Sequence, residues 1–394
     1  MARNSVCDVV IIGAGMVGAA CAYYAARAGL DVIVVDRGPV AGGTTGAGEG
    51  NLLVSDKAPG PELDLALLSE RLWRELAAEP FGRAVEYEPK GGLVVAQDEK
   101  GLAALSAFAE EQRQQGVHAT PVAADSLKEL EPHLAPGLAG GVFYPQDAQV
   151  QPALAAAHLI RAAGGSGATL RTGETVTHLL RTPGGAVRGV RTSRGEIHAP
   201  AVVNAAGVWG GEVAALGAVT LPVLPRRGFI LVTEPLPRLI RHKVYAADYV
   251  SDVASDSATL QISPVVEGTM AGPVLIGASR ERVGFERAMS LPVLRRLAAQ
   301  AIGLFPVLAT VNAMRAYVGF RPYLPDHLPA IGPDPRVPGL VHACGHEGAG
   351  IGLAPATGLL VAQVLAGAAT QLDLTPLRPE RFTAAAVRAE AEAC

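Results

Sequence analysis

The stretch CDVVIIGAGMVGAACAYYAARAGLDVIVVD, residues 7–36, decides the fold class. It begins with a continuous apolar run, passes through a glycine-rich turn, continues as a helical pattern that ends at Gly29, and closes with a second apolar run. Apolar runs without alternation are typical of parallel strands buried on both faces, and glycine commonly ends a helix. The sequence therefore predicts a strand–helix–strand unit at the start of a parallel sheet.

The turn at residues 13–18, GAGMVG, matches the dinucleotide pattern G-x-G-x-x-G. Gly13 permits the tight turn, Gly15 lets the backbone approach a pyrophosphate, and Gly18 allows close packing of helix on strand. Asp36 follows the turn by about 20 residues, where an acidic side chain accepts hydrogen bonds from ribose hydroxyls. The phosphates would meet the N-terminus of the helix. The turn itself does not distinguish NAD from FAD, and a glycine-rich turn without a ligand is the alternative.

Composition excludes several function classes. The chain has 394 residues, 49% of them hydrophobic and 18% charged, which is typical of a globular protein. The net charge of −4 and the 5% aromatic content argue against nucleic-acid binding. No apolar stretch is long enough to span a membrane. The cysteines, at positions 7, 21, 344 and 394, lack metal-site spacing, so we predict no metal site and a cytoplasmic location.

The residues after Asp36 narrow the choice of dinucleotide. Arg37 follows directly, and a loop of small and hydroxyl residues contains Thr44, Thr45 and Gly46. This arrangement resembles the FAD proteins of the D-amino-acid oxidase and glycine oxidase superfamily, in which such a loop runs along the flavin diphosphate. A flexible surface loop is the alternative.

Two further segments extend the resemblance over almost the whole chain. Residues 203–209, VNAAGVW, are similar to the family's mid-chain return to the FAD domain, which implies that Ala206 and Gly207 lie near the adenosine half. Val176, in a predicted β meander, fits the position whose backbone contacts the adenine.

Residues 318–322, VGFRP, resemble the family's Gly-x-Arg-Pro signature. The resemblance implies that Arg321 holds the carboxylate of the substrate. A planar guanidinium suits that task because two of its N–H groups bind the two carboxylate oxygens together. The alternative is a structural ion pair.

Residues 344–358, CGHEGAGIGLAPATG, open the last predicted helix. Backbone N–H groups and the helix dipole in such a loop would face the flavin near its N1–C2=O edge. The form resembles the catalytic subunits of the hydrogen cyanide synthase C, opine oxidase B and D-hydroxyproline dehydrogenase group. That implies hetero-oligomers with redox partner subunits bearing FAD or iron–sulfur centres. The implied cofactor contacts are Gly345, Gly348, Gly350, Ile351, Gly352 and Leu353.

Departures from the family bear on how the cofactor is held. Residues 319–326 contain no cysteine where sarcosine oxidases tether their flavin, so the expected FAD is non-covalent. Cys344 is more simply a small buried residue. His346 is a base or an electrostatic group near the flavin, or else a histidine satisfied by the backbone or a subunit. We assign no role to Glu347.

The resemblance and the patterns together predict an α/β protein. A discontinuous Rossmann-like FAD-binding domain is expected over residues 1–84, 142–215 and 325–394, with an inserted sheet-rich substrate-binding domain of the glycine oxidase type over 85–141 and 216–324.

The expected reaction is oxidation of an amino acid or related secondary amine to the imine by hydride transfer to flavin N5. The catalytic subunit of a multi-subunit dehydrogenase is the first interpretation. The alternatives are a stand-alone oxygen-using oxidase and a flavin-bearing structural subunit. The sequence leaves open the amine, its enantiomer and the electron acceptor.

Overall fold

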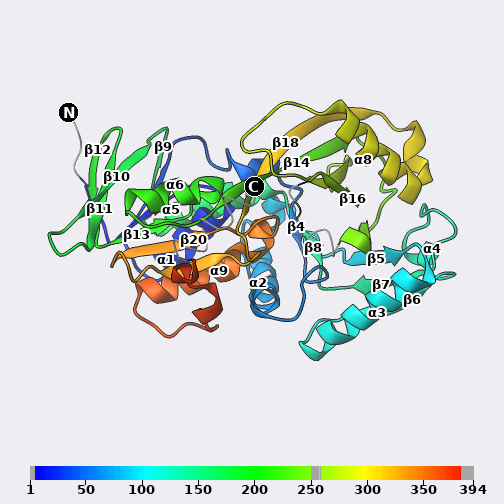
Figure 1. The fold of residues 1–394 in the computed structure, drawn as a ribbon, viewed down its shortest axis with the longest axis horizontal. Coiled ribbons are helices and arrows are strands. Elements are labelled where there is room, and N and C mark those ends of the chain that lie inside the picture. Colours follow the sequence, from blue (N-terminus) through cyan, green and yellow to red (C-terminus); the bar gives the residue numbers. More distant parts are fainter. Residues whose placement is uncertain (1–4, 250–256, 258, 383–394) are drawn as a thin grey trace.

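The structure is a computed structural model that describes residues 5–249, 257 and 259–382. Cys394 lies outside these residues, and the three cysteines within them are buried free thiols. Two large sheets lie side by side, with the nucleotide sheet on the left of Figure 1 and the second sheet on the right. No helix of the described residues is long and apolar enough to cross a membrane.

The nucleotide sheet has six strands in the order β19-β20-β13-β2-β3-β9. The expected strand–helix–strand unit is present as β2, α1 and β3, with β2 parallel to both β3 and β13. The strands and the helices on this sheet are β2 Val9–Ile12, α1 Met16–Arg27, β3 Val32–Asp36, α5 Pro152–Gly165, β9 Thr169–Thr172, β13 Ala201–Asn204, α6 Gly210–Leu216, β19 Ala330–Pro333, β20 Leu340–Cys344 and α9 Gly350–Leu365.

Alternation along β2 explains why its sequence is apolar at every position. Val9 and Ile11 belong to the core under α1 and α9. Val10 and Ile12 belong to the core on the opposite face, which a four-stranded sheet and α6 cover. That small sheet, of order β1-β12-β11-β10, is built from β1 Ser5–Val6, β10 Val176–Arg181, β11 Val187–Thr192 and β12 Gly195–His198.

The second large sheet has eight strands in the order β18-β14-β17-β16-β15-β5-β7-β6. Helix α8 packs on it through Val293, Leu297 and Ala301. Its elements are β5 Gly92–Ala96, α3 Glu99–Gln114, β6 Thr120–Ala123, α4 Leu127–Leu130, β7 Gly140–Tyr144, β14 Leu224–Thr233, β15 Lys243–Ala246, β16 Gln261–Gly268, β17 Val274–Arg280, α8 Leu291–Leu304 and β18 Ala313–Tyr323.

Segments between the two sheets connect them. Helix α2 (Pro61–Ala78) and the pair β4 (Asn51–Leu52) and β8 (Ala148–Gln149) lie there. Strand β7 belongs to the eight-stranded sheet through pairing with β5 and β6. The boundary that the sequence suggested between residues 141 and 142 therefore falls inside a strand.

Candidate active site

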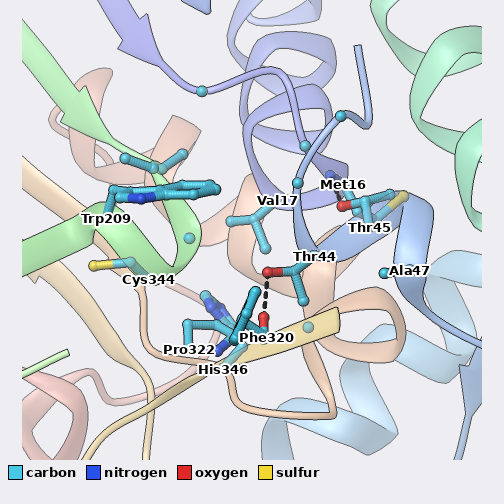
Figure 2. A pocket seen from close by; sticks show the side chains of 18 of the residues that line it. Met16, Val17, Thr44, Thr45, Ala47, Trp209, Phe320, Pro322, Cys344 and His346 are labelled. Carbon is cyan, nitrogen blue, oxygen red and sulfur yellow. Dashed lines mark hydrogen bonds between the residues drawn. The ribbon is translucent and has the colours of Figure 1, made fainter. Parts of the chain in front are cut away.

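A single cavity of about 380 Å³ extends from the end of β3 to β18, and Figure 2 shows part of its lining. Residues of the nucleotide sheet, of the loop after β3 and of the eight-stranded sheet line it together. The carboxyl ends of β2 and β3 open into it, as expected for ligands of open α/β sheets.

The three glycines of the dinucleotide turn have different surroundings. Gly13 has φ +115°, and a Cβ there would overlap with the carbonyl group of Ala205. A Cβ on Gly18 would overlap with the carbonyl group of Gly13, so both glycines are required for packing. Gly15 lines the cavity, and a Cβ there would meet only Thr45 Oγ1, at 3.2 Å. The backbone at Gly15 is therefore open to a ligand, which fits the approach of a pyrophosphate.

The end of the cavity that is expected to hold adenosine is lined by residues far apart in the sequence. Asp36 lines it, with its carboxylate accepting hydrogen bonds from the N–H groups of Ala14 and Gly38, each at 2.7 Å. The guanidinium carbon of Arg37 lies 4.2 Å from the centre of the Trp209 ring. The cavity lining here also includes Val176, Ala206 and Gly207.

The loop after β3 forms the short helix η1 (Thr44–Ala47) and joins both halves of the site. Thr45 Oγ1 accepts a hydrogen bond from Met16 N at 2.9 Å, at the N-terminus of α1. Thr44 Oγ1 donates to the carbonyl oxygen of Phe320 at 2.6 Å (Figure 2). Gly46 is not part of the cavity lining; its N–H donates to Ala41 O at 2.9 Å.

The loop between β20 and α9 reaches the cavity through only part of its length. Gly348, Gly350 and Ile351 line it. Three other expected contacts do not. Gly345 has φ +82° and packs against Leu324, Gly352 O accepts a hydrogen bond from Trp73 Nε1 at 3.0 Å, and Leu353 is buried in the core.

His346 lines the cavity and is buried, and burial lowers its pKa to about 3. Its Nε2 lies 3.0 Å from Thr357 Oγ1, which itself donates to Leu353 O at 2.9 Å. Because the Thr357 proton is used on Leu353, His346 Nε2 carries the proton that joins the two side chains. His346 is therefore a neutral imidazole with its Nδ1 as an acceptor.

Arg321 lies in β18 and lines the same cavity. Its Nη1 donates to Ser279 O at 2.9 Å, and its Nε is 3.4 Å from the place that a Cβ on Gly348 would take. Burial lowers the pKa of Arg321, and the nearby charge of Arg280 adds to this. No acidic side chain of the described residues forms an ion pair with Arg321, unlike Arg226, which pairs with Glu347 at 2.6 Å.

Sequence reasoning missed Glu49 and Tyr249, among other residues of the cavity lining, and it assigned no role to Glu347, which also lines the cavity. Although burial opposes ionisation of Glu347, the hydrogen bond with His327 and the charge of Arg226 lower its pKa to about 2. The sequence contains a signal that could have pointed to Glu49, because this residue is an acid within a loop of small residues. The sequence offered no signal for Tyr249, which the segment after β15 brings into the cavity.

Cys344 also lines the cavity, but its thiol packs against Gly210, where a Cβ would lie 2.8 Å from Sγ. Burial raises the pKa of this thiol to about 12. Since the thiolate is the nucleophilic form, Cys344 is an unreactive residue at neutral pH. The described residues contain no cluster of metal-binding side chains.

Comparison with known proteins identifies the family. The model of the family described as FAD dependent oxidoreductase matches residues 8–364. The chain is 30% identical to hydrogen cyanide synthase subunit HcnC of Pseudomonas aeruginosa, over 96% of this chain and 97% of that protein. It is 31% identical to the glycine oxidase of Geobacillus kaustophilus, over 94% and 95% of the two chains.

Solved structures agree with the sequence comparison. The crystal structure of the Geobacillus kaustophilus glycine oxidase superposes with a TM-score of 0.86 at 28% identity, covering 96% of this chain and all of the other. The chain belongs to this family of FAD-dependent oxidoreductases, and the expected superfamily and fold class are confirmed. It is an enzyme whose cofactor is FAD, and the open backbone at Gly15 beside the N-terminus of α1 fits that cofactor.

Proposed function

We propose that this flavoenzyme oxidises an amino acid or a related secondary amine to the imine, with Arg321 holding the carboxylate of the substrate. One observation carries the proposal: a half-buried guanidinium lines the cavity without an ion pair among the described residues. A charge that is largely withdrawn from water without an ion pair is costly, so an anion that completes the site is the simplest explanation. A carboxylate matches the paired N–H groups of arginine.

The main contribution of the protein to the reaction is to position the substrate. When bound, FAD accepts the hydride from the carbon next to the amine nitrogen. Arg321 orients the substrate, since its Nη1 is held by Ser279 O while its other N–H groups remain for the carboxylate. His346 stays neutral and adds no positive charge near the reacting carbon. The N-terminus of α9, at Gly350, directs its positive dipole end toward the cavity, where electron transfer leaves negative charge.

We further propose that the enzyme is the catalytic subunit of a multi-subunit dehydrogenase and passes its electrons to a redox partner in the cytoplasm. The similarity to HcnC, a subunit of a synthase, supports a subunit role. The buried free thiols at positions 7, 21 and 344 are compatible with a reducing compartment. The second candidate is an oxygen-using oxidase, which the similarity to glycine oxidase favours.

Anaerobic bleaching of the flavin tests the reaction. The purified protein is mixed without oxygen with glycine, sarcosine, D- and L-proline, hydroxyproline and opines, and the flavin absorbance is followed. Loss of the absorbance with an amino acid, but not with the amine that lacks the carboxylate, supports the proposal. Reduction by simple amines alone would contradict the role of the carboxylate.

The electron acceptor is tested separately. Affinity purification from the native cell should bring down a partner that carries FAD or an iron–sulfur centre, and the isolated subunit should consume oxygen slowly with its substrate. Rapid oxygen consumption and hydrogen peroxide formation by the isolated chain would instead identify an oxidase.

A further inference from the structure

Glu49 lies in the same cavity as Arg321 but comes from the other domain. It lies two residues after η1, and the residue is 8% exposed. Tyr249 lines the cavity with both residues. A carboxylate and a guanidinium thus line one cavity.

The two oxygens of Glu49 are not equivalent. Oε2 accepts a hydrogen bond from Asn51 Nδ2 at 3.0 Å. Oε1 is buried and has no hydrogen-bond partner in the part of the chain that the structure describes. Buried carboxylate oxygens are nearly always hydrogen-bonded, so an oxygen without a donor, on a side chain that lines a ligand cavity, calls for a donor from the ligand.

The charged groups near Glu49 do not supply the missing hydrogen bond to Oε1. Among them, Lys243 favours the ionised form of Glu49 most strongly, but it is bound to Glu267 at 2.7 Å and to Asn51 Oδ1. The charge of Arg321 also favours the ionised carboxylate. Burial raises the pKa values of Tyr249 and Tyr317, and the charge of Glu49 adds to this. Burial raises the pKa of Glu49, so its carboxylate binds a proton more readily than an exposed one.

We propose that Glu49 binds the amine of the substrate through Oε1 and accepts the proton of its ammonium group, while Arg321 binds the carboxylate. In this step an N–H bond of the ammonium breaks and an O–H bond forms at Oε1. The electron pair stays on nitrogen, so the amine becomes neutral and nothing is oxidised or reduced. The site would then select zwitterionic amino acids, primary or secondary, over acids without an amine. This inference rests on the proposed function.

Gly277 in β17 offers a way to move the carboxylate without removing it. A Cβ on Gly277 would overlap with Glu49 Oε1 and lie 2.7 Å from Glu49 Cδ. Gly277→Ala should therefore push the Glu49 carboxylate aside. Glu267→Gln is the matched control, because Glu267 contacts the same Lys243 and is absent from the cavity lining.

The test compares two ligands by calorimetric titration of the purified flavoprotein. One is 2-aminoisobutyrate, which carries an amine and a carboxylate but has no hydrogen on the carbon between them and so cannot be oxidised. The other is isobutyrate, which lacks the amine. The wild type should bind 2-aminoisobutyrate about ten- to hundredfold more tightly, the range of a hydrogen bond between charged groups. Glu49→Gln and Gly277→Ala should each reduce this preference to below about threefold, and Glu49→Asp should retain part of it.

Controls separate this inference from the proposed function. Glu267→Gln should keep the preference, and Arg321→Ala should weaken binding of both ligands. If Glu49→Gln keeps the preference while amino acids still bleach the flavin, Glu49 is not the amine site and the proposed function stands. An equal loss in Glu267→Gln would assign the effect to Lys243 and overturn the inference. A wild type that no amine reduces would overturn both proposals.

Discussion

The guanidinium of Arg321 crosses over the backbone of Gly228. Gly228 lies in β14, between β18, which carries Arg321, and β17, which carries its acceptor Ser279. A Cβ on Gly228 would overlap with Arg321 Nη1 and lie 2.5 Å from Ser279 O. The absence of a side chain at Gly228 thus allows the guanidinium of Arg321 to reach the cavity.

Arg321→Ala should lower kcat/KM for an amino acid about thirtyfold to several thousandfold, because removing one member of a desolvated charge pair costs about 2–5 kcal/mol. Arg321→Lys should restore part of the loss, since an ammonium cannot form the paired contact. Flavin content should stay normal. The measurements are anaerobic reduction rate, flavin occupancy and melting temperature on the same proteins. An unaltered reduction rate in Arg321→Ala would rule out the carboxylate role.

Gly228→Ala should weaken carboxylate binding although Arg321 remains. The added methyl group occupies the path of the guanidinium, so we expect a smaller effect than Arg321→Ala, on the order of tenfold in the Kd of isobutyrate. Gly184→Ala, in an exposed turn where a Cβ meets only Thr182 at 3.9 Å, is the control. Equal Kd values for the wild type, Gly228→Ala and Gly184→Ala would show that Arg321 can move aside without losing the carboxylate.

Gly15 and Gly18 should differ in what their substitution destroys. Gly15→Val places a side chain where the pyrophosphate must approach, while leaving the fold intact, so FAD occupancy should fall and the far-UV circular dichroism should not change. Gly18→Ala should reduce the folded yield, because its Cβ meets the backbone of Gly13. Normal FAD content in Gly15→Val would mean that the turn is not the pyrophosphate site.

FAD should be released when the protein is precipitated with acid. The motif that would carry a tether has no cysteine, and the buried thiol of Cys344 has a pKa of about 12. The supernatant should contain one FAD for each folded chain, measured by absorbance. Yellow colour that remains with the pellet after denaturation would demonstrate a covalent link.

Asp147 should make stability fall as pH rises from about 4 to 7. It is fully buried and accepts hydrogen bonds from Val54 N, Ser55 N and Ser55 Oγ, yet burial raises its pKa to about 7. The folded state therefore binds more protons than the unfolded state between the two pKa values, and the stabilisation is complete below that window and lost above it.

Asp147→Asn tests this, because an amide accepts from the two N–H groups and donates to Ser55 Oγ without a charge. Its free energy of unfolding relative to wild type should improve by about 1–3 kcal/mol between pH 5 and pH 8, measured with urea. Glu131→Gln, which alters another fully buried carboxylate, controls for the loss of any buried charge. Parallel pH profiles for wild type and Asp147→Asn would refute the assignment.

Local patterns determined the first strand–helix–strand unit and its glycine turn. Residues 9–12 and 32–36 are apolar at almost every position because both faces of those strands are covered. Gly13 and Gly18 were predictable for a similar reason, since the tight turn requires them whatever lies beyond it.

Only the tertiary structure decided which residues meet in the cavity. Glu49 lies just after η1 and Arg321 lies in β18, and Tyr249 joins them from a third segment. Among the glycines of the last motif, Gly348 faces the cavity while Gly345 and Gly352 pack against other residues. Periodicity along a chain records which face a residue occupies in its own element. It does not indicate the register and packing between distant elements, and these bring a buried carboxylate and a half-buried guanidinium into one cavity.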